Sequence, residues 1–224
     1  MFQDAQRSRR LPVFVIADRS GSMAGEKIVA VNQGMQMLKA DLEDEPRAVE
    51  SVWLSVIGFG GDARVEVPLT ELMAFYPPTL DADGGTPLGA ALRLLNESID
   101  KEVVVSSGKG TGDYKPLVFL FTDGEPTDEW ESAAREVKQR ATAQTANIIA
   151  VACGQDANVE TLRKITESVI KMDEATAGRF KALMKWISQS VKSASVKAVT
   201  PTADGGAPTT AVLAPPGAGF TVAF

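Results

Sequence analysis

Short, unbroken apolar runs that alternate with stretches of helical periodicity limit what this chain can fold into more than any other feature. An apolar run of roughly four to eight residues, ended by polar residues or glycine, is typical of a strand that is buried on both faces. Such runs lie at Leu11–Ala17, Val52–Phe59, Pro116–Thr122, Asn147–Cys153 and Val169–Met172. We expect each of them to be a strand of one sheet, with the most apolar run, 116–122, near its centre.

The stretches between these runs carry apolar residues three or four positions apart, which is the spacing of one helix face. The first stripe predicts a helix over roughly 26–43. The stripes are Ile28, Val31, Met35, Leu38 and Leu42; Leu88, Leu92, Leu95 and Ile99; Trp130, Val137 and Ala141; Val159 and Leu162; and Phe180, Met184, Ile187 and Val191. Strands that alternate with helices predict an α/β fold, a doubly wound and mostly parallel sheet with helices on both faces.

One edge of this sheet is expected to be antiparallel. Gly60-Gly61-Asp62 is a tight turn, and polar and apolar residues alternate after it from Arg64 to Val67. Such alternation is typical of a half-exposed hairpin strand.

The chain of 224 residues is long enough for one sizeable domain and a tail. We expect a polar lead over 1–10, the domain over 11–197 and a tail rich in Pro, Gly, Ala and Thr over 198–224. The composition of the tail predicts no helix or core of its own, and a solvated, extended chain is favoured over docking of its apolar end, Gly219–Phe224.

Composition excludes several classes of function. With 23 Lys+Arg against 29 Asp+Glu, the net charge is −6, which argues against a nucleic-acid partner. The absence of His and the presence of one Cys exclude His/Cys zinc sites, disulfide frameworks and Ser-His-Asp catalysis. No apolar run approaches the roughly 18 residues of a membrane span, and the run before Asp18 lacks a cleavage pattern. The expected location is a reducing cytoplasm, without a membrane partner, and Cys153 is expected to be an inert core residue.

Two strands that are expected to be adjacent both end in an aspartate. Asp18 follows the first strand and Asp123 follows the central one. In an open parallel sheet, ligands bind beyond the carboxyl ends of the strands, where the winding direction reverses. Two facing carboxylates repel each other unless a proton or a cation lies between them. Hydroxyls surround both aspartates and no basic partner is evident, so a cation is favoured.

Further oxygen donors accompany the two aspartates. Ser20 and Ser22 follow Asp18, and Thr86 stands after Gly84-Gly85 and before a predicted helix. The candidate metal ligands are therefore Asp18, Ser20, Ser22, Thr86 and Asp123. Oxygen donors without His or Cys select Mg²⁺ first, with Mn²⁺ or Ca²⁺ as alternatives.

Each of these residues also has a purely local interpretation. Asp18 and Ser20 could cap the next helix, Thr86 before Pro87 is a favoured helix start, and Asp123-Gly124 could be a plain turn. A threonine hydroxyl bound to a metal cannot also serve fully as a cap. The combination of all the motifs at strand ends favours the metal site.

The motifs Asp18-x-Ser20-x-Ser22, Gly85-Thr86 and Thr122-Asp123-Gly124, in this order, resemble the metal-ion-dependent adhesion site of von Willebrand factor type A (vWA) domains. The resemblance covers about residues 11–197. It implies that Ser20, Ser22 and Thr86 touch the ion directly, and that Asp18 and Asp123 act directly or through water. It also implies a binding module and no catalysis, with the ion accepting a carboxylate from a partner protein.

A narrower resemblance rests on fewer residues. Leu11-Pro12-Val13 and Ala30-Val31-Asn32-Gln33-Gly34 are similar to TerY-like bacterial vWA proteins. That resemblance implies an association with tellurium resistance and a partner such as a protein kinase or a metal-dependent phosphatase.

Two alternative functions remain open at this point. A Mg²⁺-dependent phosphohydrolase of haloacid-dehalogenase type also begins with an aspartate at a strand end, but it needs a second Asp where this chain has Ser20. Self-assembly is the other alternative, in which Asp204 or the terminal carboxylate of Phe224 occupies the metal site of a neighbouring copy.

Overall fold

Parallel strands form the middle of one seven-stranded sheet. A computed structural model of the chain describes residues 9–106, 112–143, 145–155, 157–174, 176–199 and 220–223. The strands are β1 (Leu11–Asp18), β2 (Val52–Gly60), β3 (Asp62–Glu71), β4 (Leu117–Thr122), β5 (Asn147–Cys153), β6 (Val169–Met172) and β7 (Phe220–Ala223). Their order is β3-β2-β1-β4-β5-β6-β7, with β3 and β7 antiparallel to their neighbours. The predicted mostly parallel sheet with an antiparallel edge hairpin is confirmed.

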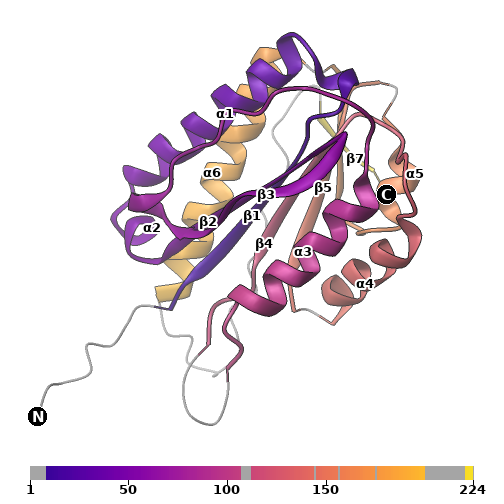
Figure 1. Ribbon diagram of the computed structural model, residues 1–224. Helices are drawn as coiled ribbons and strands as arrows, with labels where there is room; N and C mark the ends of the chain where they lie inside the picture. The colour runs from indigo at the N-terminus through magenta and orange to yellow at the C-terminus, as the bar shows by residue number, and fades with distance from the viewer. Residues whose placement is uncertain are drawn as a thin grey trace, which may run out of the picture.

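Helices cover both faces of this sheet, as the doubly wound prediction requires. The helices are α1 (Glu26–Glu43), α2 (Pro46–Ser51), α3 (Leu88–Glu102), α4 (Glu131–Thr142), α5 (Val159–Arg163) and α6 (Ala177–Val199). Figure 1 shows α1, α2 and α6 on one side of the sheet and α3, α4 and α5 on the other. None of the helices in the described ranges has the length and apolar character that a membrane span needs.

Strand β1 contributes to both hydrophobic cores because its side chains alternate between the two faces. Val13 and Val15 pack in the core beneath α1 and α6, whereas Phe14 and Ile16 pack in the core beneath α3 and α4. All eight residues of β1 are buried. Burial on both faces explains why this strand is one continuous apolar run.

The end of the chain adds a strand that the sequence did not predict. Phe220–Ala223 pairs antiparallel with β6, so the expectation of a wholly solvated tail is wrong for this segment. An edge strand exposes unpaired backbone groups, and β7 satisfies those of β6. Phe220 also packs against the core on the α1 and α6 side. The sheet therefore has an antiparallel strand at each edge.

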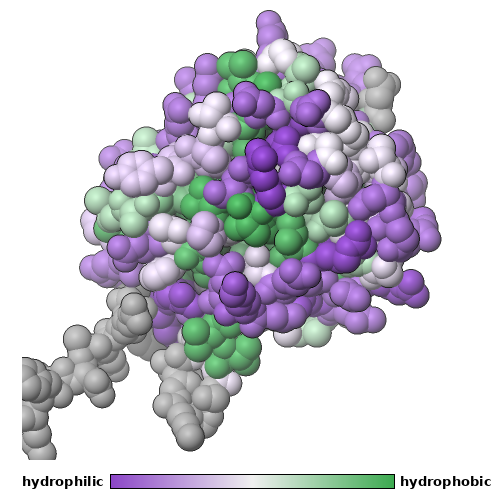
Figure 2. All heavy atoms as spheres, in the orientation of Figure 1, coloured by the Kyte–Doolittle hydropathy of each residue, from purple (hydrophilic) through white to green (hydrophobic). Residues whose placement is uncertain are grey.

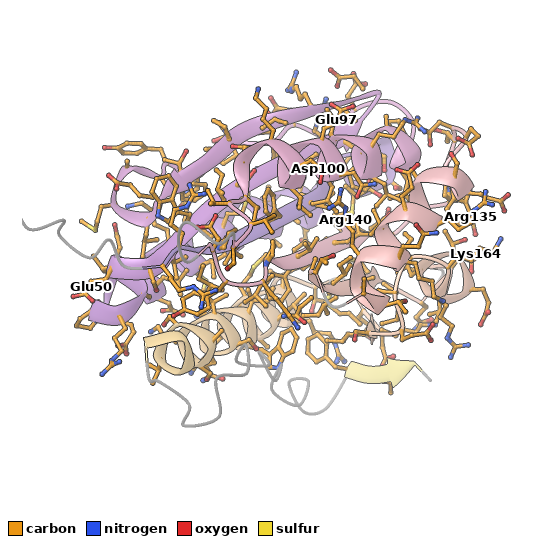
Figure 3. The ribbon with its side chains drawn as sticks, turned by 90° about the horizontal axis from the view of Figure 1, so that it is seen from below. Glu50, Glu97, Asp100, Arg135, Arg140 and Lys164 are labelled. Atoms are coloured by element: carbon orange, nitrogen blue, oxygen red, sulfur yellow. The ribbon has the colours of Figure 1, made fainter. Side chains whose placement is uncertain are left out.

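Polar contacts between α3 and α4 hold these helices together on their face of the sheet. Arg140 Nη2 donates to Asp100 Oδ2 at 2.7 Å, and Arg140 Nε donates to the buried Asn96 Oδ1 at 2.7 Å. Figure 3 shows Asp100 and Arg140 facing each other from the two helices. This pairing matters for the site because the loops before α3 and α4 carry Thr86 and Asp123.

Candidate metal centre

The register of the sheet places Asp18 and Asp123 beside each other. Ala17 of β1 lies opposite Phe121 of β4, so Asp18 is level with Thr122, and Asp123 follows by one residue. The chain winds from β1 toward β2 in one direction, and β4 begins the other half of the sheet on the opposite side of β1. The predicted switch point therefore lies between β1 and β4, where ligands of such sheets bind.

Asp18 is a fully buried carboxylate with two short hydrogen bonds. Its Oδ1 accepts from the Ser20 backbone N–H at 2.8 Å, and its Oδ2 accepts from the Thr122 hydroxyl at 2.5 Å. Burial raises the pKa of Asp18 above its ordinary value, and the bonds from Ser20 and Thr122 only partly oppose this effect. The nearby charge of Asp123 raises the Asp18 pKa further. The ionised Asp18 thus has hydrogen-bond partners but, among the described residues, forms no ion pair that would compensate its charge.

A chain of hydroxyls connects the first motif to Asp123. Ser20 Oγ lies 3.0 Å from Ser22 Oγ, and Ser22 Oγ donates to Asp123 Oδ1 at 2.5 Å. The second carboxylate oxygen of Asp123 pairs with the ammonium of Lys27. Ser22 is exposed whereas Ser20 is buried, so the group opens to solvent on the Ser22 side.

Glycines bring the loop that carries Thr86 to the same place. Gly84 O accepts from Gly21 N at 2.9 Å, and Gly85 O accepts from Gly61 N at 3.0 Å. Gly84 has φ +67°, and a Cβ there would lie 2.4 Å from Gly61 Cα. A side chain at position 84 would therefore push this loop away from the turn between β2 and β3.

Thr86 and Ser22 direct their hydroxyls toward one small region beside Gly124. A Cβ added to Gly124 would lie 3.1 Å from Thr86 Oγ1 and 3.8 Å from Ser22 Oγ. This region is therefore flanked by hydroxyls from two distant parts of the sequence. Together with the contacts of Asp18, Ser20 and Asp123, the structure brings all five predicted ligands into one group.

The helix-start interpretation of Thr86 is not supported. Pro87 is the N-cap of α3, and the free backbone N–H groups of Gly89 and Ala90 donate to the Asp128 carboxylate at 2.9 and 2.8 Å. Within the described residues, the Thr86 hydroxyl makes no hydrogen bond. The cap supplied by Asp128 leaves this hydroxyl available to a ligand. Asp128 precedes α4 in the sequence but caps α3.

Replacing Asp128 with Ala should destabilise the domain by about 1–2 kcal/mol, because two N–H groups at the start of α3 lose their acceptor. The free energy of unfolding, measured with a denaturant, checks this. Asp128→Asn keeps one acceptor oxygen and should lose less. An Asp128→Ala protein as stable as the wild type would contradict the assignment of the cap.

The donor set fits a hard divalent cation. It consists of carboxylate and hydroxyl oxygens only, as Mg²⁺ and Mn²⁺ prefer. In the part of the chain that the structure describes, no group of three or more His, Cys, Asp and Glu residues lies close enough to hold a metal. The site therefore depends on its neutral hydroxyls. The ammonium of Lys27 on Asp123 shows that the position attracts positive charge.

Arg19 lies between two residues of the first motif, a position where a charged residue is expected to be solvated, but its side chain is buried. It is 6% exposed, pairs with Asp62 and has its Nε 3.7 Å from Glu66 Oε1. These contacts connect the loop after β1 to the β2–β3 hairpin. Arg19 therefore supports the loop and is not available to an acidic partner.

Other residues near this edge are structural. Glu125 Oε1 accepts from Asn158 Nδ2 at 2.6 Å, which ties the loop after β4 to the start of α5. Cys153 is buried at the end of β5, and burial raises the pKa of its thiol. This environment agrees with the predicted inert role of Cys153.

The sequence analysis did not identify the structural roles of Lys27 and Gly60 at this site. A cation in the first turn of a helix is unfavourable, and this was the available signal for Lys27. Gly60 was interpreted only as part of a turn, but a Cβ there would lie 2.3 Å from Arg19 O. Its role depends on a contact between strands that the sequence does not show.

A mostly parallel sheet with a hydroxyl-rich oxygen site at its switch point defines an α/β domain with a candidate metal centre. The chain matches the model of the von Willebrand factor type A domain over residues 13–177. It therefore belongs to the vWA domain family, as its motifs predicted.

Curated relatives match only part of their own length. Human inter-alpha-trypsin inhibitor heavy chain H6 is 26% identical over 166 residues, which is 69% of this chain and 12% of the relative. An uncharacterized protein of Synechocystis sp. is 31% identical over 124 residues, which is 52% of this chain and 26% of the relative. The chain thus spans a small part of each.

Solved structures share the fold at low sequence identity. Proximal thread matrix protein 1 from the mussel byssus aligns with TM-score 0.58 and 18% identity, covering 82% of this chain and 48% of that one. Manganese-loaded TRAP protein of Plasmodium vivax aligns with TM-score 0.54 and 20% identity, covering 78% and 72%. The pilus adhesin SpaC from Lactobacillus rhamnosus aligns with TM-score 0.63 and 16% identity, covering 84% and 31%.

Proposed function

We propose that this domain is a protein-binding module that captures an acidic side chain of a partner at a divalent ion. The observation that carries the proposal is the convergence of five oxygen-bearing side chains at the switch point, with Thr86 free of a capping role. The manganese-loaded TRAP protein and the byssus protein with a zinc-occupied metal-ion-dependent adhesion site support the choice of a divalent cation. Mg²⁺ is proposed as the resident ion, with Mn²⁺ or Ca²⁺ as alternatives.

The side chains have separate tasks in this proposal. Ser20, Ser22 and Thr86 would offer neutral oxygens, and Asp18 and Asp123 would offer the negative charge. Ser20 N–H and Thr122 hold Asp18 in one orientation, so this carboxylate is positioned before any ligand arrives. The bound ion would supply an electrophilic position for an incoming carboxylate. Because at most two carboxylates face the dication, the site keeps affinity for a third.

A single carboxylate contact is too small for useful affinity. A stable complex needs a buried interface of roughly 1,000 Å² or more around the site. Figure 2 shows hydrophilic residues over much of the face seen in Figure 1, with apolar residues gathered near its centre. We propose that the partner is a protein that adds contacts around the metal site.

Mn²⁺ bound to the protein provides a direct test of carboxylate capture. Water bound to protein-held Mn²⁺ speeds the relaxation of solvent protons, and glutarate serves as a model of an acidic side chain. We expect glutarate to reduce the relaxation enhancement by displacing bound water, whereas the uncharged glutaramide leaves it unchanged. An enhancement that persists at saturating glutarate would contradict the capture of a carboxylate.

The phosphohydrolase alternative is less well supported by the site. Ser20 occupies the position where that class needs a second Asp, and its hydroxyl contacts Ser22. A general base is also difficult to place, because the chain has no His. Metal-dependent hydrolysis of p-nitrophenyl phosphate that is lost in Asp18→Asn would favour this enzyme over the binding module.

The TerY-like relationship, the cytoplasmic location and a kinase or phosphatase partner in a tellurium-associated system remain proposals from sequence. The residues behind the narrower resemblance have structural roles here. The Asn32 side chain donates to the backbone carbonyl of Leu80 and accepts from its backbone N–H, both at 2.9 Å. A Cβ at Gly34 would lie 2.6 Å from Met184 Cγ, so the glycine is needed for helix packing. They therefore add little to the choice of partner. For self-assembly through the tail, Asp204 and Phe224 lie outside the described residues.

A further inference from the structure

Lys27 places an ammonium group on two of the groups that surround the proposed ion site. Its Nζ pairs with Asp123 Oδ2 and donates to the Ser22 backbone carbonyl at 3.2 Å. The Asp123 side chain is 4% exposed and that of Lys27 is 33% exposed, so the pair is largely shielded from solvent. The other oxygen of Asp123 accepts from the Ser22 hydroxyl. Lys27 is therefore the counter-charge of Asp123.

The position of Lys27 is difficult to explain by helix stability. It is the second residue of α1, where the partial positive charge of the helix end favours acidic residues and disfavours lysine. The N-cap is Gly25, which has no side chain that could cap the helix and offset this cost. The ion pair with Asp123, which follows β4, explains the lysine at this position, whereas the stability of α1 does not.

The charge of Lys27 also acts at the end of the neighbouring strand β5. At the buried Cys153, the charges of Asp123 and Asp18 raise the thiol pKa, whereas the charge of Lys27 lowers it. At this position, Lys27 thus opposes the combined field of the two carboxylates. A divalent ion bound by the same carboxylates would oppose that field in the same way and would repel the ammonium.

We propose that Lys27 is an internal competitor for the divalent ion, which holds Asp123 Oδ2 and has to leave it when the ion binds. The proposal rests on the proposed function, because it presumes that Asp123 is a ligand. The lysine keeps a nearly buried carboxylate paired in the absence of the ion. Its displacement costs free energy, and Lys27 therefore lowers the affinity of the site.

Calorimetric titration of Mn²⁺ into Lys27→Met tests this competition. Met retains the unbranched side chain and removes the charge, so we expect the variant to bind Mn²⁺ about three- to tenfold more tightly than the wild type. Lys39→Met is the matched control, since Lys39 is in the same helix but pairs with Glu43, away from the site. Its Mn²⁺ affinity should equal that of the wild type.

Thermal unfolding in EDTA gives a second measurement that does not involve the ion. Lys27→Met should unfold at a lower temperature than the wild type, because Asp123 loses its counter-charge. When Lys27→Met is added to Asp123→Asn, the unfolding temperature should fall by less than when Lys27→Met is added to the wild type, as expected for two residues that interact.

The outcomes separate the two proposals. Mn²⁺ binding by the wild type together with equal or weaker binding by Lys27→Met would overturn the competition and leave the proposed function standing. Failure of the wild type to bind Mn²⁺ would overturn both. Tighter binding by Lys27→Met but not by Lys39→Met would support the role of Lys27.

Discussion

Asp18→Asn is expected to abolish ion binding and, at the same time, to stabilise the protein in EDTA. The Asp18 carboxylate is fully buried, and burial raises its pKa, so its ionised form at neutral pH costs stability. Asn removes the charge, keeps the shape and can still accept from the Ser20 N–H. We expect about 1 kcal/mol of added stability and a loss of Mn²⁺ affinity of at least about 100-fold.

The stability gain should depend on pH in a defined direction. Because the folded-state pKa of Asp18 lies above its ordinary value of 3.8, protonation stabilises the wild type at low pH, and this stability is lost as pH rises through the folded-state pKa. The advantage of Asp18→Asn should therefore be small in acid and larger near neutral pH.

Denaturant unfolding in EDTA and Mn²⁺ titration measure the two effects. Asp83→Asn, at an exposed carboxylate of the neighbouring loop, is the control and should change both little. A marked loss of stability in Asp18→Asn at neutral pH would show that the charge supports the fold, against our account.

Gly60→Ala is expected to destabilise the domain by about 3 kcal/mol and to weaken ion binding. A Cβ at position 60 would lie 2.3 Å from Arg19 O and 2.7 Å from Ser20 N. Neither backbone atom can move without shifting the Ser20 N–H, which donates to Asp18, and the Ser20 side chain that the site uses. One methyl group on β2 should therefore disturb a site on the neighbouring strand.

Gly178→Ala is the matched control for this substitution. Gly178 is in α6, and a Cβ there would meet no atom within 4 Å, so Ala should be neutral or slightly stabilising. Equilibrium unfolding with a denaturant, followed by Mn²⁺ titration of the folded variants, gives both quantities. If Gly60→Ala is as stable as the wild type, the close approach of β2 to the Arg19–Ser20 peptide is not important.

The main elements could be predicted because the strands are buried on both faces and the long helices have one buried stripe. The predicted helix 26–43 coincides with α1, and the predicted strand 147–153 coincides with β5. The proximity of Asp18 and Asp123 followed from topology alone, since they lie at the carboxyl ends of neighbouring parallel strands. These features depend on local periodicity and on one general rule of parallel sheets.

The features that were missed depend on contacts between distant residues. Strand β7 has four residues and exists through its pairing with β6, and α2 has six residues, too few for a periodic stripe. The ion pairs of Arg19 and Lys27 were not predicted, because their acidic partners lie 43 and 96 positions away in the sequence. Single-sequence patterns do not report such pairs.

The most direct test of the account is electron paramagnetic resonance titration of Mn²⁺ into the wild type and Thr86→Val. Val replaces the hydroxyl by a methyl group of similar size, and the Thr86 hydroxyl makes no hydrogen bond within the described residues that this change would break. We predict that the wild type binds Mn²⁺, and that Thr86→Val binds it at least about tenfold more weakly with an unchanged unfolding temperature in EDTA. Equal Mn²⁺ affinity in the two proteins would contradict the assignment of these oxygens as a metal site.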